Sequence, residues 1–231
     1  MIKIDVLTLF PGMFEGPMTE SMLKRAREKK LIEINVHNIR DFAEGRHRIT
    51  DDSVYGSGGM VLKPEPIYKA VEHLKNRSTS NVRRPTVVLM TPDGKTFDQE
   101  TAKKLAKKKH LIFICGHYEG VDERVRKIVD EEISIGDYVL TGGELPAMVC
   151  IDTIARMIKG VVGRQGAIEE ESFYKNILDC PHYTRPPVFR KMKVPDILLS
   201  GDHKKIADWR AEKALERTKK YRPDLLKEIK K

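Results

Sequence analysis

The chain has 231 residues, 40% of them hydrophobic, which is enough for a sizeable core and excludes a largely disordered protein. No apolar run approaches the roughly 18 residues that span a bilayer, and nothing marks the strand-like start as a signal peptide, so we expect no membrane association. The net charge is +9, and residues 174–231 carry 16 Lys and Arg against 8 Asp and Glu. Such a segment suits a polyanion such as nucleic acid, although a basic tail without a partner would have the same composition.

Up to about residue 160, short apolar runs alternate with helical patterns. The pattern predicts strands at 2–9, 31–39, 86–90, 111–115 and 133–140, and helices at 18–29, 66–75, 99–108, 124–131 and 146–158. Two of the strand runs, 86–90 and 111–115, are continuously apolar, as in strands that are covered on both faces of a parallel sheet. The alternation therefore predicts an α/β domain.

The last quarter of the chain has a different character. Residues 160–171 contain three glycines and three consecutive glutamates, which is typical of a linker. Prolines keep the chain irregular to about Leu199, and Asp202 is placed to cap a helix over 203–220. We expect an α/β domain at 1–160, a flexible linker or lid at 161–173, and a small helical domain at 174–231.

The expected C-terminal helix has a basic face and an apolar one. Its basic face is formed by Arg210, Lys213, Arg217 and Lys220, and its apolar contacts include Ile206, Trp209 and Leu215. Trp209 is interpreted as a core residue rather than as a platform for base stacking.

The three cysteines, Cys115, Cys150 and Cys180, are an odd number at wide spacing. This pattern fits a reducing cytoplasm and disfavours a disulfide framework. Neither a Cys-x-x-Cys nor a His-Glu-x-x-His motif occurs, so no residue is assigned to a metal.

Three expected strands are followed by loops rich in glycine or polar residues, at 91–94, 116–120 and 141–144. Ligands of open α/β sheets bind outside the carboxyl ends of the strands, so these loops predict a small-molecule pocket, with ordinary turns as the alternative. Neither a Gly-x-Gly-x-x-Gly nor a Walker A motif is present, which disfavours a dehydrogenase or an NTPase. A further loop at 46–60 mixes basic, acidic and glycine residues, and its composition fits either phosphate or base binding or simple flexibility.

Several long sequence motifs favour ligand binding over ordinary turns and flexible loops. They are LFPGMF (9–14), RHR (46–48), CGHYEGVDER (115–124), SIGDYVL (134–140), GGELPAM (142–148), LDCPHYTRP (178–186) and LSG (199–201). With these runs, in this order over nearly the whole chain, the sequence resembles the bacterial tRNA (guanine-N1)-methyltransferases of the SPOUT superfamily.

The resemblance implies an α/β domain tied in a deep trefoil knot, a homodimer with shared active sites, and S-adenosylmethionine as methyl donor. The implied substrate is tRNA, at the guanosine at position 37, just 3′ of the anticodon and preceded by a guanosine. The donor-binding positions map to Thr91, Pro92, Gly94, Gly116, Tyr118, Glu119, Ile135, Gly136, Tyr138, Leu140, Gly142, Gly143 and Pro146. The substrate-binding positions map to Arg46, His47, Asp52, Tyr55, Gly58 and Gly59, and the basic face at Arg210, Lys213, Arg217 and Lys220 is expected to grip the tRNA backbone.

The resemblance also maps the catalytic pair to Glu171 and Arg156. A carboxylate can take the proton from the guanine ring nitrogen, an arginine can stabilise the charge on the carbonyl oxygen, and the base must be flipped out to be reached. Glu171 stands where the family usually has aspartate, and the glycine loop at 54–60 is one residue shorter than the common form. Without the resemblance, Arg156 would be interpreted as an arginine at a helix end and Glu171 as a solvated linker charge.

Two alternatives to this function are weighed against the sequence. A non-enzymatic RNA-binding protein would explain the basic C-terminal segment but would leave the three glycine loops, Arg156 and Glu171 without a role. A SPOUT enzyme acting on another nucleotide is disfavoured by the runs after residue 177. The sequence does not decide whether magnesium is required.

Overall fold

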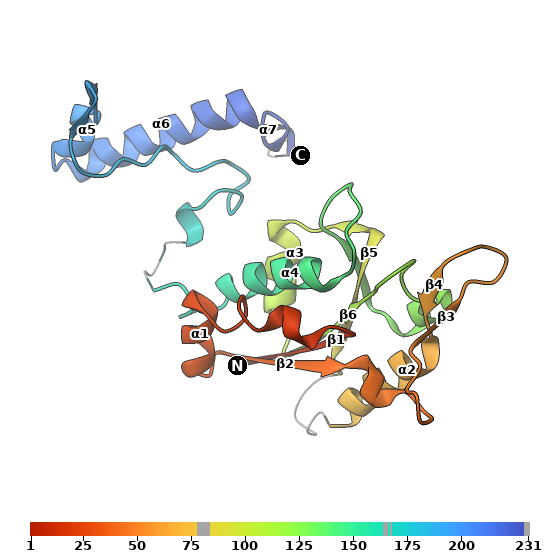
Figure 1. The fold of residues 1–231 in the computed structure, drawn as a ribbon. Helices are drawn as coiled ribbons and strands as arrows, with labels where there is room; N and C mark the ends of the chain where they lie inside the picture. Colours follow the sequence, from red (N-terminus) through yellow and green to blue (C-terminus); the bar gives the residue numbers. More distant parts are fainter. Residues whose placement is uncertain (78–83, 164–165, 167, 229–231) are drawn as a thin grey trace. The chain divides into compact units, whose positions relative to one another are not determined.

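The computed structural model describes residues 1–77, 84–163, 166 and 168–228, which form two compact units, Met1–Gly163 and Arg164–Lys231 (Figure 1). The first unit contains, in chain order, β1 (Ile2–Thr8), η1 (Pro11–Phe14), α1 (Ser21–Glu28), β2 (Ile32–Asn38), η2 (Ile39–Phe42), β3 (Asp51–Ser53), β4 (Met60–Leu62), α2 (Pro64–Asn76), β5 (Thr86–Thr96), α3 (Gln99–Ala106), β6 (His110–Cys115), η3 (Glu123–Ile128), β7 (Glu131–Ser134) and α4 (Glu144–Arg156), where η marks a 3-10 helix. The second contains η4 (Ile168–Glu170), β8 (Val188–Phe189), β9 (Met192–Lys193), α5 (Asp196–Leu199), α6 (His203–Tyr221) and α7 (Leu225–Glu228).

A five-stranded sheet in the order β2-β1-β6-β5-β7 forms the centre of the first unit. Every neighbouring pair is parallel, and Val6 of β1 faces Val36 of β2 on one side and Phe113 of β6 on the other. The predicted α/β domain with a parallel sheet is therefore confirmed. Because all five strands run the same way, the loops that follow β5, β6 and β7 emerge at one edge of the sheet.

Helices cover both faces of this sheet (Figure 1). On one face α1, α3 and α4 pack against β-strand side chains such as Ile4 and Phe113, and on the other face α2 packs against side chains such as Leu89 and Ile112. Every residue of β6 is buried, as the continuous apolar run at 111–115 predicts for most of the strand. Each fully buried leucine or isoleucine side chain contributes about 1.5–3 kcal/mol. The two cores hold the sheet edge, and hence the loops on it, in place.

Two predicted elements are wrong in part. The strand expected at 133–140 ends at Ser134, because the Ser134 hydroxyl accepts from the Gly136 N–H at 3.2 Å and Gly136 has a φ of 148°. The helix expected at 124–131 is the shorter 3-10 helix η3, which Asp122 caps by accepting from the Arg124 N–H at 2.9 Å. As a result, residues 135–143 form a long loop at the sheet edge.

In the second unit, α6 begins where the sequence predicts, with the Asp202 side chain accepting from the Lys205 N–H at 3.1 Å. Leu215 is 40% exposed, contrary to its expected role as an apolar contact. The buried face of α6 instead presents Ala214 and Thr218, and the Thr218 hydroxyl accepts from the Leu178 N–H.

Of the predicted linker, residues 164, 165 and 167 lie outside the described residues, and 168–170 form η4. The hairpin β8–β9 and the short helix α5 interrupt the stretch that was expected to be irregular up to Leu199. In the described part of the chain, no helix combines the length and the apolar character needed to cross a membrane.

Candidate functional site

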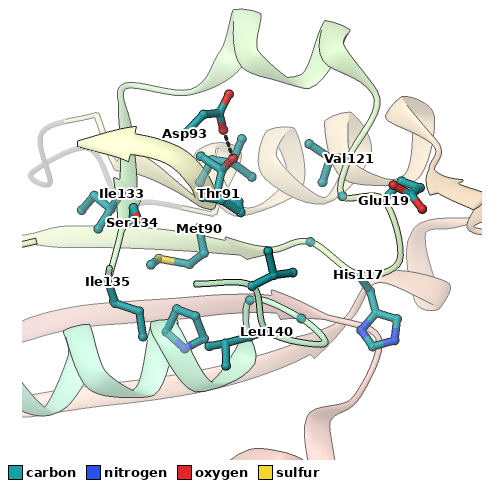
Figure 2. A pocket seen from close by; sticks show the side chains of 18 of the residues that line it. Met90, Thr91, Asp93, His117, Glu119, Val121, Ile133, Ser134, Ile135 and Leu140 are labelled. Atoms are coloured by element: carbon teal, nitrogen blue, oxygen red, sulfur yellow. Dashed lines mark hydrogen bonds between the residues drawn. The ribbon is translucent and has the colours of Figure 1, made fainter. Parts of the chain in front are cut away.

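One cavity of about 470 Å³ lies at the carboxyl ends of β5, β6 and β7, and we call it the glycine-loop cavity (Figure 2). It is lined by the segment that interrupts β5, by the loop after β6 and by the loop after β7. These are the three loops that the sequence pattern singled out. The parallel sheet brings them together because β6, β5 and β7 are consecutive neighbours in it.

The first wall of the cavity is a bulge in β5. Met90 and Lys95 both pair with Ile133 of β7, so the four residues 91–94 leave the ladder and project at the sheet edge. Within the bulge, the Thr91 hydroxyl hydrogen-bonds the Asp93 carboxylate, as Figure 2 shows. Gly94 packs directly on β7, since a Cβ on it would lie 2.5 Å from the Ile133 nitrogen. Gly94 therefore permits the bulge and is absent from the cavity lining.

The second wall is the loop after β6, which is tied to the hairpin of β3 and β4. The Glu119 N–H donates to the Met60 carbonyl at 3.0 Å, and the Leu62 N–H donates to the Gly120 carbonyl at 3.1 Å. A Cβ on Gly59 would lie 3.0 Å from the Glu119 side chain. These contacts place the end of the glycine loop at 54–60 beside the wall of the cavity.

The third wall is the loop 135–143, which folds back onto the end of β6. The Gly143 N–H donates to the Gly116 carbonyl at 2.8 Å, and Gly142 forms a bridge with His117. A Cβ on Gly143 would lie 2.8 Å from the Cys115 Cα and 3.0 Å from the Gly116 nitrogen. Glycine is needed here because real side chains do not approach a backbone so closely.

Twelve of the thirteen predicted donor-binding residues lie in the lining of this one cavity, and Gly94 is the exception. Whether they bind a donor stays a prediction. The lining also contains residues that sequence reasoning did not select, among them Asp93, His117, Glu123, Arg126 and Ser134. Asp93, His117 and Ser134 are next to selected residues and could have been found from the loops, whereas Arg126 belongs to the segment 124–131, which was predicted as a helix, and Glu123 directly precedes it.

The charged side chains that line the cavity are mostly acidic. They are the carboxylates of Asp93, Glu119 and Glu123 and the guanidinium of Arg126. The hydrogen bond from Thr91 lowers the pKa of Asp93; burial opposes this shift, and the charge of Arg126 adds to it. The lining therefore favours a ligand with positive charge.

A buried carboxylate lies behind the lining. Glu144, the first residue of α4, is 1% exposed and accepts from the Thr8 hydroxyl at 2.7 Å. The helix N-terminus stabilises negative charge at this position. Burial, followed by the charge of Glu144, raises the pKa of the Cys115 thiol well above its ordinary value. Cys115 is thus a packed core residue without nucleophilic character.

The residues predicted to bind the substrate do not all come together. Arg46 and His47 line a second cavity of about 340 Å³ together with Lys63 and Lys69. Tyr55 is fully exposed at 100%, and the Asp52 carboxylate accepts from the Ser53 N–H in β3. Gly58 and Gly59 belong to the glycine loop beside Glu119, where Gly58 has open space around it.

The predicted basic face of α6 is already partly engaged within the second unit. Lys213 forms an ion pair with Glu216 at 2.7 Å, and Arg217 donates to the Asp179 carbonyl at 3.2 Å. The Lys220 ammonium lies 5.0 Å from the centre of the Tyr221 ring, and Arg210 is exposed. Trp209 is half-buried, with its ring 6.4 Å from that of Tyr183.

The predicted catalytic residues belong to different units. Arg156 is the last residue of α4 in the first unit and is half-buried. Glu171 directly follows η4 in the second unit and is also half-buried. The pairing of their side chains in one active site stays a prediction.

Comparison with known proteins identifies the family. The sequence profile of the tRNA (Guanine-1)-methyltransferase TrmD family matches residues 2–228. Proteins named tRNA (guanine-N(1)-)-methyltransferase are similar over nearly their full length: one from Endomicrobium trichonymphae is 54% identical, covering 98% of this chain and 100% of its own. One from Carboxydothermus hydrogenoformans is 56% identical, covering 98% and 88%, and one from Dictyoglomus turgidum is 55% identical, covering 98% and 90%. The chain belongs to the tRNA (guanine-1)-methyltransferase family.

Proposed function

We propose that the chain transfers a methyl group from S-adenosylmethionine to N1 of the guanosine at tRNA position 37, when a guanosine precedes it. The observation that carries the proposal is the glycine-loop cavity, in which three loops of a methyltransferase-family chain meet in one acid-lined space. A tRNA-modifying enzyme acts where tRNA is found, so the expected compartment is the cytoplasm.

The residues of the cavity fit the donor chemically. S-adenosylmethionine supplies an electrophilic methyl group on a positively charged sulfur, and the acidic lining suits that charge. The lining is rich in glycine, and a glycine presents no side chain to a ligand, so peptide groups of these loops can hydrogen-bond a nucleoside. We assign donor binding to the twelve predicted residues in the lining, and exclude Gly94, which supports the bulge from behind.

The two predicted catalytic residues would handle the proton and the charge of guanine. Glu171 accepts the proton from N1, which leaves an electron pair on that nitrogen for the new bond to carbon. Arg156 hydrogen-bonds the carbonyl oxygen, where negative charge gathers as the proton leaves. Both residues are half-buried, which fits groups that a flipped base could reach.

We further propose a homodimer with shared active sites. Exposed apolar side chains on the loop before α4 and on α4 itself support it: Val139 is 85% exposed, Leu145 is 48% exposed and Val149 is 47% exposed. A polar loop and helix would be expected at these positions in a monomer. Sedimentation of the active protein tests this, since full activity in a monomer at micromolar concentration would contradict it.

The remaining features of the proposal concern the fold and the substrate. The return of the loop 135–143 to the end of β6 supports the trefoil knot of the family. The excess positive charge of residues 174–231 supports a tRNA-binding role for the second unit, with 161–173 as linker or lid. Magnesium is assigned to no residue, and assays with and without a chelator test whether it is needed.

The decisive experiment is mass spectrometry of an unmodified tRNA transcript after incubation with the protein and the donor. One added methyl group on the nucleoside at position 37 is expected, and none when position 36 or 37 is changed from guanosine to adenosine. The variant Glu171→Gln keeps the shape of the side chain and removes its basicity, so it serves as the matched inactive control. Binding of tRNA without methylation by the unaltered protein would reject the proposal.

A further inference from the structure

The segment η3 carries a side chain, Arg126, that joins the β5 bulge, η3 and β7 beside the glycine-loop cavity. The Arg126 guanidinium donates to the Asp93 carboxylate at 2.6 Å and to the Glu123 carboxylate at 3.0 Å, and it also pairs with Glu132. Asp93 is the third residue of the β5 bulge, Glu132 belongs to β7, and Glu123 begins η3. A single planar guanidinium thus connects the bulge to the strand beside it.

Arg126 is more enclosed than its partners on the rim. Its side chain is 27% exposed, against 64% for Asp93 and 83% for Glu123. An arginine suits this position because its five N–H donors lie in one rigid plane and can serve several carboxylates at once, whereas a lysine ammonium is a point charge on a flexible stem. The bond to Asp93 spans 33 positions of sequence, so it restrains the bulge from outside its own strand.

The bulge has few other restraints on its apex. Thr91 and Asp93 bond one another across the turn, and Gly94 anchors the far end against β7. Neither contact connects the apex at Asp93 to another element, and the hydrogen bond that does so comes from Arg126. Because Thr91 and Pro92 form part of the cavity lining, the position of the apex sets the width of that wall.

We propose that Arg126 is a positioning residue for donor binding, which clamps the 91–94 bulge of β5 against β7 and so keeps the glycine-loop cavity in its binding shape. This inference rests on the proposed function, because it takes S-adenosylmethionine as the ligand of that cavity. Without the clamp the bulge adopts other conformations as well. The apparent affinity for the donor is then the intrinsic affinity multiplied by the fraction of molecules in the binding conformation.

The test measures the dissociation constant for S-adenosylmethionine by calorimetry, together with the methylation rate at saturating donor. If the competent shape is populated about a tenth of the time without the clamp, Arg126→Ala raises the dissociation constant about tenfold. The rate at saturating donor stays within about twofold, because donor binding then restores the shape. Glu132→Gln, which alters the β7 end of the clamp and lies outside the cavity lining, shifts the dissociation constant in the same direction by less.

Lys104→Ala is the matched control, since Lys104 forms an ion pair at 2.6 Å with Glu131, the neighbour of Glu132 on β7, away from the cavity. This variant leaves donor affinity unchanged. Unchanged affinity in folded Arg126→Ala would overturn the clamp. The clamp would also be overturned if Arg126→Lys bound the donor as tightly as the unaltered protein and Glu132→Gln left donor affinity unchanged. Arg126 would then act only through its positive charge on the ligand. Failure of the unaltered protein to bind the donor would reject the proposed function instead.

Discussion

Replacing Gly143 by alanine tests how closely the loop 135–143 packs on the end of β6. The added Cβ would lie 2.8 Å from the Cys115 Cα, 3.0 Å from the Gly116 nitrogen and 3.1 Å from the Met90 Cβ. None of these atoms is the far end of a flexible side chain, so the backbone itself must move. Gly143 has a φ of −81°, which alanine adopts freely, so the whole effect comes from packing.

The cost follows from this geometry. Overpacking of a close-packed interior costs about 1–3 kcal/mol. For a protein of this size, each kcal/mol lowers the melting temperature by about 2–4 °C, which gives a decrease of roughly 2–12 °C. The fold survives, since domains are stable by about 5–15 kcal/mol. Donor affinity suffers more, because the displaced residues Gly116 and Gly143 line the cavity and share a 2.8 Å hydrogen bond.

Thermal denaturation with and without S-adenosylmethionine measures both effects in one assay. The variant Gly143→Ala should melt earlier and gain much less from the donor than the unaltered protein does. Gly12→Ala is the control, because a Cβ on Gly12 of η1 meets nothing within 4 Å. A Gly143→Ala protein with unchanged melting temperature and unchanged donor response would refute the packing and the assignment of the cavity together.

Three further predictions concern charged side chains: a buried carboxylate in the core, the proposed catalytic base and an arginine on the basic face of α6. Burial alone would raise the pKa of Asp5, but hydrogen bonds from His110 and His37 and the charge of Lys3 outweigh it and hold that pKa well below 3.8. The folded-state pKa is the lower one, so this stabilisation is present above about pH 4 and is lost as the pH falls further; Asp5→Asn should therefore lower the melting temperature more at pH 7 than at pH 3. Glu171→Gln should slow methyl transfer in single turnover by at least about 100-fold with tRNA affinity nearly intact, whereas Glu170→Gln should be mild, and near-normal transfer by Glu171→Gln would remove Glu171 as the base. Removing the charge of Arg210 should raise the Michaelis constant for tRNA and flatten its salt dependence, and a change in turnover alone would contradict a phosphate contact.

Much of the first unit could be predicted because its signals are local. The continuous apolar runs at β5 and β6 and the helical pattern of α4 are properties of consecutive residues. The loops that line the cavity are marked by their own glycines and prolines, so twelve lining residues could be named from the chain alone, once the resemblance had aligned them. The polar cap at Asp202 is local in the same sense, since it acts on an N–H three residues away.

Two of the predictions failed, one because the packing of a helix was not foreseen and one because a local turn ended a strand. Leu215 has the right character for a core residue, but the turn of α6 that faces the rest of the second unit carries Ala214 and Thr218. The expected strand 133–140 has strand-forming residues, yet a bond between Ser134 and Gly136 turns the chain out of the sheet. The apolar character of a residue alone does not determine whether it is buried or belongs to a strand, because both depend on the elements that pack against it.

Periodicity and turn residues act over a few positions, so the chain alone predicted the parallel α/β domain and the three loops at the strand ends, and its long motifs carried the resemblance to the family. What those loops contact depends on the packing of elements that are distant in the sequence. Met90 and Lys95 both pair with Ile133, so residues 91–94 loop out of β5 as the bulge. Gly94 packs against β7 behind the cavity wall and does not line the cavity. The tertiary structure also brings Arg126 to Asp93 across 33 residues, from a segment that the sequence pattern marked only as a helix. Such contacts arise when separate elements pack on one sheet edge, and no local pattern encodes them.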